Sequence, residues 1–179
     1  MNFKAIIPIL VLSAMLFGAV AMWSETLKIN ATINTGEVKV KFSSWSCSDT
    51  GSDPQAEGFH NDENKNVATC GVSVEEVDGE GNPIKLLVTL NNTYPGYSVD
   101  VNLVIDNIGT IPVKLLSSSI TGVNETALAV SLDIPEDTQI DPEGNSTYTL
   151  HITVLQEAEE NSTYTFEVEL VFAQWNEVA

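Results

Sequence analysis

Residues 26–42 read TLKINATINTGEVKVKF, and they show the pattern that most of the chain repeats. Apolar residues occupy every second position on both sides of the turn signal Asn34-Thr35-Gly36. They are Leu27, Ile29, Ala31 and Ile33 before the turn, and Val38, Val40 and Phe42 after it. An apolar-polar alternation with a period of two predicts β-strands that bury one face and expose the other.

The same period continues to the end of the chain. Further strand-like runs are Val72–Val77, Ile84–Leu90, Ser98–Asp106, Val113–Ile120, Leu128–Leu132, Tyr148–Leu155 and Tyr164–Phe172. Clusters of Gly, Pro, Asn and Asp separate them, as in Asp78–Pro83 and Asn107–Thr110. No long stretch after residue 23 repeats at helical spacing. We therefore predict an all-β fold, a jelly-roll or Ig-like antiparallel β-sandwich over residues 36–179.

The first 21 residues resemble an export signal. Lys4 supplies a positive start, Ala5–Val20 is an apolar run, and Ala19-Val20-Ala21 has the small residues that a signal peptidase accepts. We expect a signal peptide over residues 1–21 and a secreted protein at the cell surface or outside the cell. Two alternatives retain the apolar run: a membrane anchor, because Ala5–Trp23 approaches the roughly 20 residues that cross a bilayer, or a type IV pilin-like precursor cut near Lys4.

Composition excludes one class of partner. The 179 residues include 25 Asp and Glu but only seven Lys and no Arg, which gives a formal net charge of −18. Phosphate contacts need clustered basic side chains, so we expect no nucleic-acid partner. The hydrophobic fraction of 43% is too high for a disordered acidic chain.

Cysteines and glycosylation sequons agree with an extracellular location. Cys47 and Cys70 are the only cysteines, and in an oxidising compartment they would form a disulfide; two free buried thiols are the alternative. The pair would hold the base of a polar insertion loop over residues 43–71. Sequons for N-glycosylation occur at Asn30, Asn91, Asn124, Asn145 and Asn161.

The insertion loop also offers oxygen ligands for a metal ion. Its acidic side chains are Asp49, Asp53, Glu57, Asp62 and Glu63, with His60 among them. Oxygen ligands suit Ca²⁺, although the spacing matches no EF-hand loop and a solvated acidic loop is the competing interpretation. We expect no enzymatic activity, because none of the common motifs for nucleophilic, zinc or nucleotide chemistry is present.

The N-terminal segment, residues 22–35, has an unusual apolar face formed by Trp23, Leu27, Ile29, Ala31 and Ile33. The segment could serve as an edge strand of its own domain. It could instead complete the sandwich of a neighbouring molecule, where an incoming strand pairs unpaired backbone groups and fills an apolar groove. Such a contact, repeated head to tail, does not close and produces a filament.

Four segments of the chain resemble the camelysin/TasA-like family, which includes bacterial biofilm-matrix fibre proteins and archaeal bundling pili. They are Trp23–Phe42, Asn92–Tyr97, Ile105–Lys114 and Phe172–Asn176, in family order. The resemblance implies a jelly-roll-like sandwich, secretion, and polymerisation by donor-strand exchange with Trp23–Ile33 as the donor. The insertion loop departs from the bacterial pattern, and no zinc-ligand cluster supports the metallopeptidase activity described for some bacterial relatives.

Together these features predict a structural subunit of an extracellular filament, either a bundling pilus or a biofilm-matrix fibre. Its partners would be further copies of itself, with lateral bundling of filaments and with membrane contact only through the signal segment. The alternatives are a membrane-tethered or type IV pilin-like surface adhesin and, third, a camelysin-like metallopeptidase.

Overall fold

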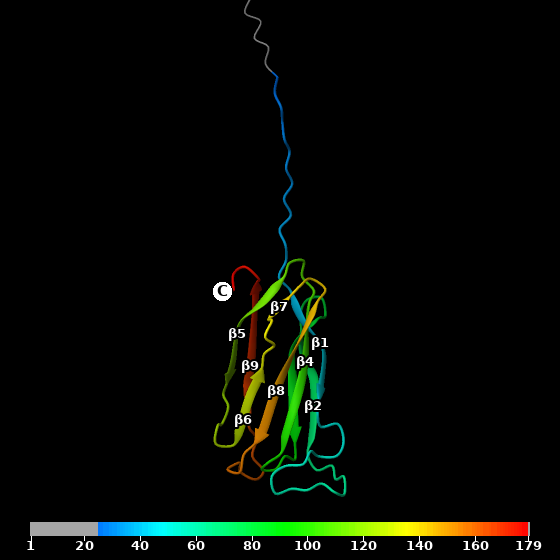
Figure 1. The fold of residues 1–179 in the computed structure, drawn as a ribbon, viewed down its shortest axis with the longest axis vertical. Helices are drawn as coiled ribbons and strands as arrows, with labels where there is room; N and C mark the ends of the chain where they lie inside the picture. The colour runs from blue at the N-terminus through cyan, green and yellow to red at the C-terminus, as the bar shows by residue number, and fades with distance from the viewer. Residues whose placement is uncertain (1–24, 179) are drawn as a thin grey trace, which may run out of the picture. The chain divides into compact units, whose positions relative to one another are not determined.

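The computed structural model describes residues 25–178, and its regular structure is entirely β (Figure 1). The strands are β1 (Val40–Cys47), β2 (Thr69–Val77), β3 (Pro83–Asn91), β4 (Ser98–Asn107), β5 (Val113–Thr121), β6 (Leu128–Asp133), β7 (Gln139–Ile140), β8 (Asn145–Val154) and β9 (Glu167–Gln174). All strand pairs are antiparallel, which confirms the predicted all-β sandwich. Within residues 25–178 no helix is long and apolar enough to cross a membrane. The predicted signal peptide and Trp23 lie outside the described residues.

One layer of the sandwich is a continuous four-stranded sheet in the order β1-β4-β8-β6. Its central strands alternate between buried and more exposed positions, β4 along its whole length and β8 from Tyr148 onward. Val99, Val101, Leu103 and Ile105 of β4 point to the core beside Tyr148, Leu150, Ile152 and Val154 of β8. This alternation is the period-two pattern of the sequence, and burial of these side chains stabilises the fold.

The second layer consists of two separate small sheets, β2-β3 and β7-β5-β9. Both sheets turn half-buried apolar side chains toward the core, among them Val72, Leu86, Val88, Leu170 and Phe172. In the described residues, β3 pairs only with β2 and β9 pairs only with β5. Among the described strands, the second layer therefore has two additional strand edges, at β3 and β9, which one continuous sheet would not have.

The observed strands match seven of the predicted runs, but the borders of the insertion loop were wrong. Residues 43–47 belong to β1 and residues 69–71 belong to β2, so the loop spans residues 48–68. The serines of β1 are compatible with a strand because β1 is an edge of its sheet, with an irregular register between Phe42 and Ser44. Trp45 packs against the core, and Ser43 Oγ donates to Asp106 Oδ1 over 2.6 Å. The two-residue β7 was too short to be predicted.

The N-terminal segment is a structural unit distinct from the sandwich, with the division between Asn34 and Thr35. Residues 25–39 form no strand in this chain, and β1 begins at Val40, two residues after the predicted start. Backbone hydrogen bonding in the sandwich starts at Glu37, whose carbonyl accepts from Thr110 N, and continues at Lys39, whose carbonyl accepts from Ile108 N and Gly109 N. A side chain at Gly109 would collide with the backbone of Glu37, so this close approach requires glycine.

Candidate functional site

An open groove of about 850 Å³ lies between the two sheets of the second layer. We call it the β3–β9 groove, because β3 forms one wall and β9 the other. Its apolar lining includes Phe42 of β1, Ile84, Leu86 and Val88 of β3, Leu103 and Ile105 of β4, Leu150 of β8, and Val168, Leu170 and Phe172 of β9. The β4 and β8 residues are buried core residues, whereas the wall residues are only partly covered. The groove thus opens onto the core of the sandwich.

Both walls of the groove are edge strands of their sheets. Among the described strands, β3 and β9 each have one side without a strand partner, and both line the same groove. An edge strand presents a row of N–H and C=O groups to any incoming backbone. A strand placed between them would join β2-β3 and β7-β5-β9 into one layer and would place alternate side chains over the core. Charged residues stand at the rim, including Lys85, whose ammonium lies 3.3 Å from the carboxylate of Glu75.

The N-terminal segment carries apolar side chains that are almost fully exposed in its own chain. Leu27 is 87% exposed, Ile29 93% and Ile33 85%, and Ala31 is exposed as well. Isolated exposed apolar side chains are common on proteins, but a regular alternating row of them marks a surface that gains from burial. These residues were expected to share one strand face; within this chain they belong to no strand.

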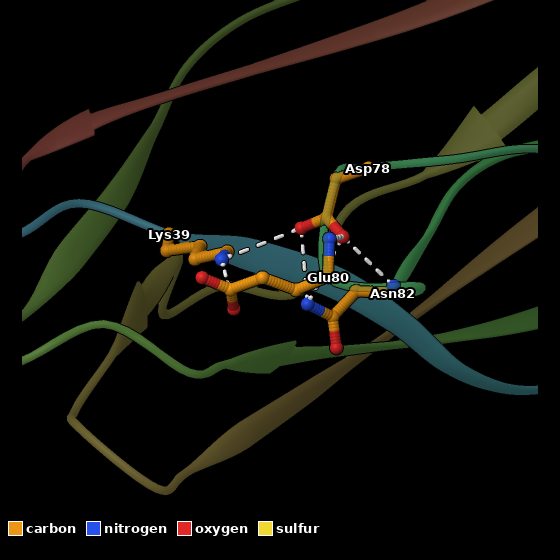
Figure 2. A network of polar contacts seen from close by, with 4 residues as sticks. All are labelled: Lys39, Asp78, Glu80 and Asn82. Atoms are coloured by element: carbon orange, nitrogen blue, oxygen red, sulfur yellow. Dashed lines mark hydrogen bonds and ion pairs between the residues drawn. The ribbon is translucent and has the colours of Figure 1, made fainter.

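A polar network fixes the point where the chain enters the sandwich (Figure 2). Lys39 Nζ lies 2.6 Å from Glu80 Oε2 and 3.4 Å from Asp78 Oδ2. Asp78 Oδ1 also accepts hydrogen bonds from the backbone N–H groups of Glu80 and Asn82 at 2.8 and 2.9 Å, which shapes the β2–β3 turn. The hydrogen bonds from Asn82 hold the pKa of Asp78 well below its usual range, and the bond to Glu80 raises the pKa of Lys39. No local pattern in the sequence indicates this network.

The predicted disulfide is present, and it joins Cys47 at the end of β1 to Cys70 near the start of β2, with 6.2 Å between the two Cα atoms. It therefore closes the base of the loop over residues 48–68, as expected. The five exposed sequon asparagines are Asn30, Asn91, Asn124, Asn145 and Asn161, so all are sterically open to modification. A disulfide is consistent with an oxidising compartment.

The acidic residues proposed as metal ligands do not gather at one place. Asp49 and Asp53 are buried, whereas Glu57, Asp62 and Glu63 are exposed on the loop. In the part of the chain that the structure describes, no three His, Cys, Asp or Glu side chains form a group that could hold a metal ion. Of the five candidate ligands, only Asp49 and Asp53 turn inward, and the other three do not join them.

Buried hydrogen bonds give the loop a defined shape. Asn61 donates to the carbonyls of Asp53 and Lys65 at 2.9 and 2.8 Å, and its Oδ1 accepts from Lys65 N at 2.7 Å. The carboxylate of Asp53 accepts from the backbone N–H groups of Val67 and Ala68 at 2.8 and 3.2 Å. Loop residues 53 and 61–68 are thus tied to one another without regular secondary structure.

A third polar cluster lies on the four-stranded sheet, on the side that faces away from the core. His151 Nδ1 is 2.6 Å from Asp100 Oδ1, and His151 Nε2 is 3.1 Å from Asp133 Oδ2. These three residues come from the adjacent strands β4, β8 and β6. The bond to Asp100, followed by the bond to Asp133, raises the pKa of His151. The cluster is a cross-strand charge contact in which both ring nitrogens already have carboxylate partners.

The described residues therefore offer one large apolar site, the β3–β9 groove, and three polar clusters on loops and strand surfaces. Sequence reasoning found the exposed N-terminal segment, but it gave no signal for the groove, because the groove arises from two sheets far apart in the chain. No protein-family model, curated protein or solved structure matches this chain.

Proposed function

We propose that the protein is a structural subunit of an extracellular filament, in which the N-terminal segment of one copy adds as a strand to the β3–β9 groove of the next. One observation carries the proposal: two strand edges flank an open apolar groove, while an alternating apolar segment of the same chain is exposed. Donor and acceptor thus complement each other in backbone hydrogen bonding and in apolar surface.

The dimensions of donor and acceptor agree. Leu27–Ile33 has seven residues and would span roughly 23 Å as a strand at about 3.3 Å per residue. The walls of the groove, β3 and β9, have nine and eight residues. Alternate residues of the donor, namely Leu27, Ile29, Ala31 and Ile33, would face Leu103, Ile105 and Leu150 beneath. The polar residues between them would face outward.

The arrangement favours an open polymer. The donor segment and the groove are different surfaces. Each subunit would insert its donor segment into the groove of one neighbour and receive the donor segment of another neighbour in its own groove. A heterologous contact of this kind extends without limit unless its rotation closes a ring. The resemblance to bundling pili and matrix fibres points to the same class of assembly.

The surface chemistry fits an extracellular polymer. A formal net charge of −18 per chain opposes lateral contact between filaments unless salt, divalent cations or glycans offset the repulsion. The disulfide and the five exposed sequons are compatible with secretion. Bundling is therefore expected to increase with ionic strength.

Deletion of Met22–Ile33 tests the proposal. The truncated protein should be secreted and folded, because its β-sandwich retains all nine strands, but it should stay monomeric by size-exclusion chromatography and show no fibres by electron microscopy. A synthetic peptide of residues 22–35 should bind the truncated protein, whereas a peptide of the same composition in scrambled order should not. Normal fibres from the deletion variant would disprove the donor-strand mechanism.

N-terminal sequencing of the assembled protein provides a second check. A chain that begins at Met22 has a free donor segment. A chain that retains Ala5–Ala21 would favour the membrane-tethered or type IV pilin-like alternative.

A further inference from the structure

Two aspartates of the loop over residues 48–68 are buried without a cationic partner. Asp49 is 5% exposed and Asp53 is 4% exposed. Asp49 Oδ1 has no hydrogen-bond partner, although it is shielded from solvent, and the same is true of the hydroxyl of Tyr94. Buried polar groups normally have partners, so two such atoms in one region of the fold require an explanation.

The other contacts of the two carboxylates are short and specific. Tyr97, which is fully buried, donates its hydroxyl to Asp49 Oδ2 over 2.5 Å. Asp53 accepts from the backbone N–H groups of Val67 and Ala68. Tyr94 and Tyr97 stack edge to face with ring centroids 5.5 Å apart, which places the two phenols side by side.

Hydrogen bonds bring Asp53 to the segment that carries the two phenols, because Asn92, two residues before Tyr94, donates to the carbonyl of Val67, whose N–H donates to Asp53. Burial, followed by the nearby carboxylates of Asp53 and Asp49, raises the pKa of Tyr94 to about 12. Burial and the bond to Asp49 raise the pKa of Tyr97 further. The ion pairs among residues 25–178 all involve other carboxylates. Lys65, the lysine of this loop, is paired with the exposed Glu63 at 2.9 Å.

We propose that Asp49 and Asp53 bind a calcium ion, with the free Oδ1 of Asp49, the carboxylate of Asp53 and the hydroxyl of Tyr94 as protein ligands. Buried carboxylates are stable when a cation or a proton offsets their charge. Calcium takes six to eight oxygen ligands in adaptable geometry, with water molecules in the remaining positions. Structural zinc sites are built mainly from cysteine and histidine, and both cysteines are in the disulfide. The site would tie the loop to the turn before β4, and it does not depend on the filament proposal.

The test uses the full-length secreted protein after removal of metal with EGTA. Calcium is added in isothermal titration calorimetry and in thermal unfolding, and terbium emission is recorded with excitation through tyrosine. We expect one ion per chain, a rise in melting temperature with calcium, and sensitised terbium emission, because Tyr94 and Tyr97 adjoin the site. Absence of both heat and a melting-temperature shift in the wild type would overturn the proposal.

Variants locate the site. Asp49→Asn keeps the side-chain shape and an acceptor for Tyr97 but removes the charge; Asp62→Asn removes an exposed charge from the same loop and serves as the matched control. Loss of even a partner of a metal ligand costs about 10- to 100-fold in affinity, so Asp49→Asn should weaken calcium binding by at least about tenfold. Asp62→Asn should bind as the wild type does. Equal weakening in both variants would indicate a diffuse acidic surface and would refute the site.

Two further measurements keep the proposal testable. If Asp49→Asn does not fold, Tyr94→Phe removes one ligand oxygen without adding a charge, and unchanged calcium affinity in this variant would contradict the assignment. A proton shared between the two carboxylates is the competing explanation. It predicts a metal-free protein that gains stability as the pH falls and gains nothing from calcium, and that result would also refute the proposal.

Discussion

Replacement of Ile29 by serine is the sharpest test of the donor segment. Ile29 is 93% exposed in its own chain, so the substitution should leave the melting temperature of the monomer unchanged. In the filament the side chain would be buried in the β3–β9 groove of the neighbouring subunit. Full burial of an isoleucine side chain contributes about 1.5–3 kcal/mol. The Ile29→Ser variant would lack most of that contribution, and its serine would place a hydroxyl against the apolar floor of the groove.

The lost burial free energy predicts a change in the critical concentration for assembly. Each 1.4 kcal/mol corresponds to about a tenfold change in an association constant, so the critical concentration for assembly should rise roughly 10- to 150-fold. Sedimentation of fibres over a dilution series measures this concentration. Thr32→Ser is the matched control, because Thr32 belongs to the opposite, polar face of the segment and the change keeps the Asn30 sequon. An unchanged critical concentration for Ile29→Ser, or equal effects of the two variants, would refute the reasoning.

Three further predictions concern the stability of the sandwich. Asn107→Ala should lower the free energy of unfolding of the sandwich by about 3 kcal/mol or more, as measured by urea unfolding. The buried Asn107 side chain makes three hydrogen bonds of 2.9 Å to backbone groups, and each buried group left without a partner costs about 1–3 kcal/mol. A loss below about 1 kcal/mol would show that water replaces the Asn107 side chain. Reduction of the Cys47–Cys70 disulfide, which spans 23 residues, should cost about 3 kcal/mol, and an unchanged melting temperature in dithiothreitol would contradict this. The pKa of His151 is raised, so its contribution to stability is complete below the ordinary value of 6.5 and disappears as the pH rises through the raised value. Unfolding free energies across this pH range should therefore decline in the wild type relative to His151→Gln, and parallel curves would disprove the contribution.

Much of the β-sandwich could be predicted from the chain alone. Residues with strict alternation, such as those of β4 and β8, are central strands with one face on the core, and the turn residues between them mark the strand ends. The disulfide followed from the presence of only two cysteines. The edge strand β1 was harder, because solvent on one side allows serines that make residues 43–47 resemble a loop.

The candidate sites were predicted only in part. The apolar face of residues 27–33 is visible in the sequence, since it depends on local alternation. Which acidic side chains of the loop turn inward is not visible, because Asp49 and Asp53 differ from Asp62 only in the backbone groups and phenols that surround them. Such contacts join residues that are far apart in the chain.

The sequence by itself determined most of the strands and which face of each is apolar, because these properties depend on neighbours two residues away. Tertiary structure alone decided that the second layer is divided, with β3 and β9 as facing walls of one groove. Strand order depends on pairing between segments that are far apart in the chain. An unpaired strand edge can therefore be identified only when the pairing of all the other strands is known.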